Sequence, residues 1–231
     1  MQPIIATAAA WHDRFTAFAA RLDSVASLLL RLILAPVLIY AGWEKITGVN
    51  WFGSALASFP FPFNVLPAEL SWFLAAWTEF LGGILLLFGC ATRFVAIPLA
   101  VTMFVGAYGV HLQNGWPAIA PSNPPAVCVP TTEAHARSSV IERYIKCQNV
   151  NDRTIEGAKR LAVAKDILRE HGNYRYLNGS GSIVKLNSGI EFAAIYFAML
   201  IALLVIGGGR YLSVDYYVRL LTAHHASATR E

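Results

Sequence analysis

The sequence contains few charged residues and few residues with soft or redox-active side chains. Of its 231 residues only 14% are charged, and it has three cysteines, three methionines and six histidines. Soluble domains carry about 25% charged residues, so the low charge argues against an ordinary soluble protein. Three cysteines are too few for a disulfide-rich scaffold, and the high apolar content excludes intrinsic disorder over most of the chain.

The usual signatures of nucleotide, haem and iron–sulfur binding are also missing. The sequence has no GxGxxG, no P-loop, no CxxCH and no iron–sulfur spacing of cysteines. A haem held between membrane helices needs two axial ligands, and His111 is the only histidine in a long apolar run, so we expect neither haem nor an iron–sulfur cluster. The basic residues are scattered and accompany no binding motif, which argues against nucleic-acid binding.

Long apolar runs dominate what is present, since 56% of the residues are hydrophobic. A helix needs about 20 apolar residues to cross the hydrocarbon core of a bilayer. Four stretches meet this length, at residues 25–45, 70–92, 94–112 and 189–208. Backbone polar groups in lipid must be hydrogen-bonded within the segment, so we predict an all-α membrane protein with a four-helix transmembrane bundle.

The distribution of arginine predicts the topology. Four spans place both termini and the turn between the second and third helices on one side of the membrane. That side holds Arg14, Arg21, Arg93, Arg210, Arg219 and Arg230. Because basic residues favour the cytoplasmic side, we predict a multi-pass protein of the bacterial inner membrane. Residues 1–24 and 210–231 are then cytoplasmic, residues 25–112 and 188–209 hold the transmembrane helices, and residues 113–187 are extracytoplasmic. Charges within residues 1–24 argue against a cleavable signal peptide.

Residues 113–187 are predicted to form a small, mostly helical cap inserted between the third and fourth helices. Five prolines in residues 117–130 favour an extended stretch. Ser139 and Glu142 have the spacing of a capping box, and residues 154–171 have helical periodicity ending at a glycine. Residues 182–186 have the pattern of a short strand.

Two cysteines, Cys128 and Cys147, lie in this predicted cap. In an oxidising compartment a disulfide between them is the preferred interpretation. A redox-active or metal-binding pair is the alternative, although no CxxC and no histidine at ligand spacing supports it. We predict no metal site in the chain.

Ionisable residues inside the apolar runs are the candidate ligand-binding or proton-handling groups, because charges in a bilayer are costly and usually functional or paired. Glu79 lies deepest, and small residues at helical spacing around it predict that it faces the bundle interior. Arg31 and Lys45 can each reach towards it. The full set of candidates is Glu79, Lys45, His111, Glu191, Arg31, Glu44 and Asn114. A buried salt-bridge network that fixes helix register is the structural alternative.

The order of several short motifs resembles the DoxX family of small four-helix membrane proteins. The motifs are Gly42-Trp43-Glu44-Lys45, Glu79-x-x-Gly82-Gly83 with Thr92-Arg93, Asn114-Gly115, and Gly207-Gly208-Gly209-Arg210 leading to Asp215. The long loop between the third and fourth helices is similar to that of a longer subgroup found beside copper-binding peptide systems. The resemblance implies a setting in membrane redox complexes, such as thiosulfate:quinone oxidoreductase and oxidative-stress assemblies. It does not identify an established catalytic residue in this sequence.

Three functions follow from these observations. The first is a subunit of a redox-associated membrane system that binds a quinone or another small apolar molecule, with a partner redox subunit supplying the electrons. The second is a non-enzymatic membrane partner whose cap binds a secreted peptide or protein, in copper or other metal handling. The third is a small proton-coupled transporter using Glu79 and Glu191, which requires a homo-oligomer. At most we expect a subunit of an oxidoreductase complex, since no catalytic centre is recognisable in the chain alone.

Overall fold

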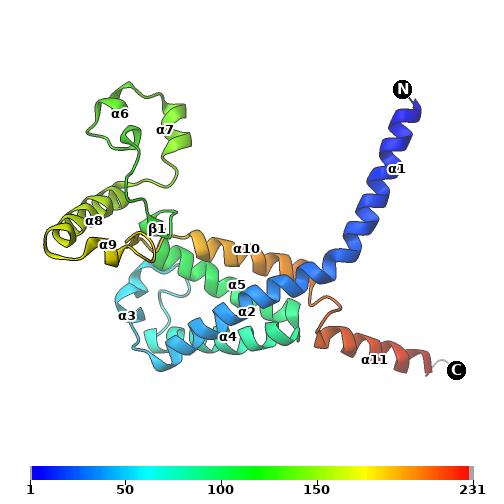
Figure 1. The fold of residues 1–231 in the computed structure, drawn as a ribbon. Coiled ribbons are helices and arrows are strands. Elements are labelled where there is room, and N and C mark those ends of the chain that lie inside the picture. The colour runs from blue at the N-terminus through cyan, green and yellow to red at the C-terminus, as the bar shows by residue number, and fades with distance from the viewer. Residues whose placement is uncertain (1, 229–231) are drawn as a thin grey trace. The chain divides into compact units, whose positions relative to one another are not determined.

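The computed structural model of the protein describes the backbone of residues 2–228 and the side chains of residues 9–20 and 22–223. The chain is mostly helical, and Figure 1 traces its elements in order. These elements are α1 (Gln2–Ala19), η1 (Ala20–Leu22), α2 (Asp23–Thr47), α3 (Phe52–Ala55), η2 (Leu56–Ser58), α4 (Ala68–Phe88), α5 (Thr92–Gly106), η3 (Ala107–His111), η4 (Leu112–Asn114), β1 (Ile119–Ala120), η5 (Ala126–Cys128), α6 (Glu133–Arg137), α7 (Val140–Lys146), α8 (Asp152–His171), α9 (Tyr174–Leu177), β2 (Lys185–Leu186), α10 (Glu191–Ile206) and α11 (Val214–Ala228).

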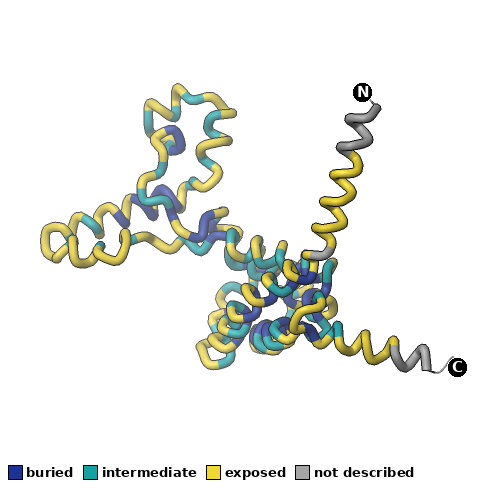
Figure 2. Tube along the Cα trace, turned by 45° about the vertical axis from the view of Figure 1, so that its right-hand side comes forward, coloured by how far each residue is buried: buried dark blue, intermediate teal, exposed yellow. Residues whose placement is uncertain are grey.

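The chain divides into two compact units. The first, here called the bundle unit, comprises Met1–Leu56, Val65–Phe104 and Tyr196–Glu231. The second, here called the loop unit, comprises Ala57–Asn64 and Val105–Ile195. Each unit has its own buried residues, which Figure 2 shows in dark blue along the chain.

Three helices are long and apolar enough to cross a membrane. They are α2, α4 and the continuous helical segment Thr92–Asn114, which joins α5 to η3 and η4. Each carries many large apolar side chains on its outside, as expected of a surface that meets lipid rather than water. The fourth apolar helix, α10, has 16 residues and a length of about 24 Å, which is shorter than a standard span. The four-span topology therefore stays a prediction.

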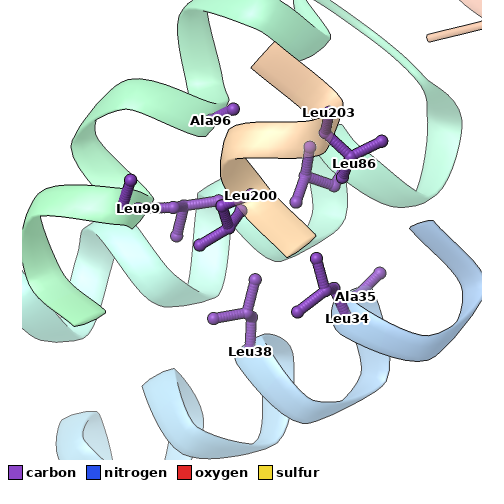
Figure 3. Packing of buried hydrophobic residues seen from close by; sticks show 9 residues of the cluster. Leu34, Ala35, Leu38, Leu86, Ala96, Leu99, Leu200 and Leu203 are labelled. Atoms are coloured by element: carbon purple, nitrogen blue, oxygen red, sulfur yellow. The ribbon is translucent and has the colours of Figure 1, made fainter. Parts of the chain in front are cut away.

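The core of the bundle unit contains residues from α2, α4, α5 and α10. Figure 3 shows these side chains pointing towards one another from the four helices. All are aliphatic and at most 6% exposed, and the cluster consists of Leu34, Ala35, Leu38, Leu86, Ala96, Leu99, Ala100, Leu200 and Leu203. The cluster combines leucine with alanine, so large side chains fill the space that small ones leave between the helices.

Glycine allows α2 and α4 to pack closely. A Cβ atom on Gly42 of α2 would overlap the backbone of Phe80 and Ala76 in α4. A Cβ atom on Gly83 of α4 would lie 2.9 Å from the backbone nitrogen of Ile39 in α2. Small residues at such contacts let two membrane helices approach each other directly, and packing then holds them together.

The loop unit is held by local caps, one short sheet and one disulfide. β1 and β2 pair antiparallel, with Ile119 opposite Leu186. The N-terminus of α8 has a full capping box, in which Asn151 and Thr154 each accept a backbone N–H from the other. The hydroxyl of Ser139 accepts the backbone N–H of Glu142 and so caps α7.

The predicted elements agree with the structure in type, and their ends differ by a few residues. The helix predicted at 154–171 is α8, and the strand predicted at 182–186 is the shorter β2. The proline-rich residues 117–130 contain β1 and the single turn η5. Two long helices were not predicted, α1 and α11, which lie in the segments described from sequence as an N-terminal segment and a tail. The short helices α3, α6 and α9 were not predicted either.

Candidate functional site

The candidate site centres on an ion pair between α2 and α4. Nζ of Lys45 donates to Oε2 of Glu79 at 2.5 Å, and also lies 3.4 Å from the carbonyl oxygen of Ala41. The Glu79 side chain is only 5% exposed, whereas that of Lys45 is 24% exposed. The carboxylate is thus enclosed by the helix contact, while the ammonium group reaches the surface of the unit.

Aromatic side chains surround this level of the contact between α2 and α4. The ring of Trp43 lies 5.8 Å from that of Phe80, and the ring of Trp77 lies 6.1 Å from it on another side. Nε1 of Trp72 donates to the backbone oxygen of Lys45 at 2.9 Å, which ties the end of α2 to α4. The residues that neighbour the pair on α2 and α4 thus form an aromatic cluster, part of which is exposed at Trp43 and Trp77.

Arg31 has a different set of partners from Lys45. Its guanidinium donates to the carbonyl oxygens of Leu86, Leu87 and Leu212 at 3.0–3.4 Å, and to that of Tyr211 at 2.6 Å. The residue is fully buried. Between the two cations that could reach Glu79, the structure selects Lys45, and Arg31 instead satisfies the carbonyls at the C-terminus of α4 and in the segment before α11.

Asp215 caps a helix at this end of the bundle unit, and it was not among the site residues predicted from the sequence. The carboxylate of Asp215 accepts the backbone N–H groups of Ala91 and Thr92 at 2.6 and 2.8 Å, and so caps α5 from another part of the chain. Ser27 donates to the backbone oxygen of Gly207 at 2.6 Å. The motif from Gly207 to Asp215 therefore stabilises the fold through hydrogen bonds to backbone groups. In the sequence, the only indication of this motif is the resemblance to the DoxX family.

The other predicted site residues lie in two places. In the loop unit, Nδ1 of His111 donates to the backbone oxygen of Ser188 at 2.7 Å, and Nδ2 of Asn114 donates to the same oxygen at 2.9 Å. Oε2 of Glu191 accepts the backbone N–H of Ala118 at 2.9 Å. Glu44, in the bundle unit, is exposed and has no ion pair or hydrogen bond from its side chain among the described residues.

His111 keeps one ring nitrogen available. Since Nδ1 donates to a carbonyl oxygen, the neutral ring carries its proton there and Nε2 is an acceptor. Nε2 makes no hydrogen bond within the described part of the chain, and the residue is half-buried. His111 can thus accept a proton or hydrogen bond while its orientation stays fixed.

The Sγ atoms of Cys128 and Cys147 are bonded, with their Cα atoms 5.4 Å apart. The bond joins η5 to the end of α7 within the loop unit. Cys90 is a free cysteine of the bundle unit. Over the described residues, no three His, Cys, Asp or Glu side chains gather in a way that could hold a metal ion.

The long apolar helices and the buried ion pair between them define an integral membrane protein. The sequence model of the DoxX family matches residues 26–112. Residues 26–112, which hold the first three long apolar helices, are therefore a DoxX-like segment of the chain.

One relative from Haemophilus influenzae (strain ATCC 51907 / DSM 11121 / KW20 / Rd) is 40% identical over 94 residues and is described only as an uncharacterized protein. The match covers 41% of this chain and 62% of the relative, so the chain spans about three-fifths of that protein's length. No solved structure matches the chain. The family match includes Arg31, Lys45 and Glu79 but ends before Asn114, so residues 113–231, with most of the loop unit and α10, lie outside it.

Proposed function

We propose that the protein is an integral subunit of a redox-associated membrane system and binds a quinone, or another small apolar molecule with a polar head, at the Lys45–Glu79 pair. The observation that carries this proposal is the pair itself, an ammonium and a carboxylate 2.5 Å apart between two membrane helices. Ionisable groups at such positions are costly, and they commonly mark ligand or proton sites.

The chemistry of the pair suits a quinone head. Lys45 has three N–H donors, of which its bonds to Glu79 and Ala41 use two, and its side chain is partly exposed. A quinone oxygen needs one such donor, and its reduction requires protons that a carboxylate can relay. The rings of Trp43, Phe80 and Trp77 supply an apolar surface beside the pair, as small-molecule sites usually do.

The proposal includes the membrane placement predicted from sequence. Both termini are cytoplasmic in the bacterial inner membrane, and residues 113–187 are extracytoplasmic. The disulfide between Cys128 and Cys147 supports this orientation, because disulfides persist outside the reducing cytoplasm. His111 is a second proton-accepting group that a partner redox subunit or a bound molecule can use.

Native mass spectrometry with lipid extraction and quinone analysis tests the proposal. The gently purified wild type is expected to retain one quinone, and Glu79→Gln is expected to lose it. Glu44→Gln is the matched control, since Glu44 neighbours Lys45 but is exposed and has no described side-chain partner. The variant Lys45→Met/Glu79→Leu removes both charges together, so it separates loss of the site from loss of stability. Absence of quinone from all four proteins, before and after adding a short-chain ubiquinone, would contradict the proposal.

A second candidate function has a specific observation in its favour. The helix α7 exposes four large apolar side chains on one face, each between 65% and 74% exposed: Val140, Ile141, Tyr144 and Ile145. The adjacent disulfide fixes the end of this helix. A contiguous apolar face outside the membrane is typical of protein-binding surfaces, so the loop unit is a candidate receptor for a secreted peptide or protein.

Site-specific photocrosslinking in intact cells tests this second function. A photoreactive residue at Tyr144 is expected to give one discrete product, whereas the same group at Arg160, on the exposed side of α8, is expected to give none. The product must disappear with Ile141→Ser/Ile145→Ser in the same chain. Equal labelling at both positions would show a surface without a specific partner.

A further inference from the structure

A cavity of about 360 Å³ lies at the end of the bundle unit where α10 ends and α11 begins. Its lining comes from the start of α2, the Gly209–Arg210 turn and the first half of α11. Apolar atoms come from Ile206 and Leu220, and a phenolic group comes from Tyr216. This volume is within the range of small-molecule sites, which extends from about 300 to 1,000 Å³.

The residues that line the cavity carry more positive than negative charge. Arg210 and Arg219 both line the cavity, against the single carboxylate of Asp23. Asp23 already accepts the hydroxyl of Ser24 at 3.0 Å. Nε of Arg219 donates to the backbone oxygen of Asp215, and no described carboxylate pairs with either guanidinium.

The nearest acidic group on α11 is directed elsewhere. The Asp215 carboxylate caps α5 through the N–H groups of Ala91 and Thr92, so it does not neutralise Arg219 one turn further along the helix. Two guanidinium groups beside an open cavity therefore have donors to spare. Guanidinium binds phosphate oxygens in bidentate geometry, and this gives it preference for phosphate-bearing groups.

We infer that this cavity binds a phosphate group attached to an apolar or glycerol-like body, with Arg210 and Arg219 on the phosphate and Ile206 and Leu220 against the body. The apolar helix α10 ends at the cavity, which is the level at which a phospholipid headgroup lies. A soluble phosphomonoester offers the same chemistry. The site is independent of the Lys45–Glu79 pair.

Binding measurements on the delipidated full-length protein in neutral detergent test this inference. The probes are phosphatidylglycerol, phosphatidylcholine and glycerol 3-phosphate, followed by native mass spectrometry for the lipids and calorimetry for the soluble probe. Removing both guanidinium groups with Arg210→Gln/Arg219→Gln is expected to weaken binding by about tenfold or more, the effect of losing one charge-assisted hydrogen bond. The charge-matched control is Arg160→Gln/Arg169→Gln, which changes two exposed arginines of the loop unit.

The outcomes separate the two sources of the phosphate. Arginine-dependent binding of phosphatidylglycerol assigns the site to lipid, and arginine-dependent binding of glycerol 3-phosphate assigns it to a soluble ligand. Leu220→Trp fills the cavity without changing charge and is expected to weaken binding as well. Binding that is equal in wild type, both double variants and Leu220→Trp, or no binding of any probe, would overturn the inference.

Discussion

Nζ of Lys45 lies 2.5 Å from Oε2 of Glu79, and the two residues are 34 positions apart on helices that cross at glycine. The contact joins an enclosed carboxylate to a partly exposed ammonium group. Removing one member of a buried pair leaves the other charge uncompensated, whereas replacing both can be neutral. This asymmetry gives the first prediction.

Lys45→Met is expected to lower the free energy of unfolding by about 3 kcal/mol, because it leaves the enclosed carboxylate of Glu79 unpaired. Glu79→Leu is expected to cost less, because the ammonium group of Lys45 is partly exposed. The double variant Lys45→Met/Glu79→Leu is expected to regain most of this loss, because no lone charge remains. The measurement is unfolding by sodium dodecyl sulfate in mixed micelles, with Glu44→Gln as a variant that should leave stability unchanged. Additive losses in the double variant would mean that the two residues do not act as a pair.

Arg31→Leu is expected to destabilise the bundle unit by at least about 3 kcal/mol, since four carbonyl oxygens lose a charged donor. Arg31→Lys should recover little, because an ammonium group cannot reach the spread of acceptors that a planar guanidinium serves. The same unfolding measurement applies, with the exposed Arg160→Leu as control. Full stability in Arg31→Lys would show that charge alone, rather than geometry, holds the contact.

Gly42→Ala is expected to push α2 and α4 apart, since the added methyl group would overlap the backbone of Phe80. The cost should exceed about 1 kcal/mol, the lower end of the range for overpacked sites. The matched control is Gly106→Ala in α5, where no atom lies within 4 Å of the new Cβ. That variant should be stabilising by about 0.5–1 kcal/mol through helix propensity. Equal effects of the two substitutions would contradict a close helix contact.

Asp215→Ala is expected to cost about 1–2 kcal/mol, the usual effect of losing a helix cap. The N–H groups of Ala91 and Thr92 lose their acceptor, so the first turn of α5 should exchange its amide hydrogens faster. Hydrogen exchange followed by mass spectrometry measures this locally. Asp13→Ala, an exposed residue of α1, provides the reference. Unchanged exchange at residues 91–95 would remove Asp215 from its capping role.

Cys128→Ser/Cys147→Ser is expected to destabilise the loop unit by about 3 kcal/mol, since the bond closes a loop of 19 residues. Local hydrogen exchange in α6 and α7 should rise, with little change in α2 or α4. In wild type, thiol labelling under denaturing conditions should modify Cys90 alone until a reductant is added. Labelling of all three cysteines without reductant would place the loop unit in a reducing compartment and contradict the proposed orientation.

The apolar runs predicted the long helices because burial in lipid leaves a signal in composition. Residues 25–45 correspond to α2, and residues 94–112 fall within Thr92–Asn114. The partner of Glu79 could not be chosen from depth alone, since Arg31 and Lys45 both lie on α2. Both residues face α4, so the choice depends on how α2 and α4 align along their length: Lys45 lies level with Glu79, and Arg31 lies beside Leu86 and Leu87 near the end of α4.

The helices α1 and α11 were not predicted because neither is apolar throughout. Their large apolar residues recur at helical spacing among polar ones, as at Trp11, Phe15 and Phe18 in α1. This pattern is typical of a helix lying at a surface, and it is weaker in sequence than a transmembrane run. The capping role of Asp215 also depends on a contact with residues more than 120 positions earlier, which no local pattern reveals.

The partners of Arg31 also set an order of events during synthesis. Tyr211, which accepts its shortest hydrogen bond, follows Arg31 by 180 residues. At roughly 5–20 residues per second, the ribosome reaches Tyr211 about 10–40 s after it has placed Arg31. Throughout that interval the nascent chain holds an arginine whose acceptors are incomplete, so the first apolar helix requires the insertion machinery or water at the membrane surface to solvate it. Tyr211 and Leu212 therefore complete the hydrogen bonding of Arg31 late in synthesis. Truncation before residue 211 should leave the protein unable to insert stably into the bilayer.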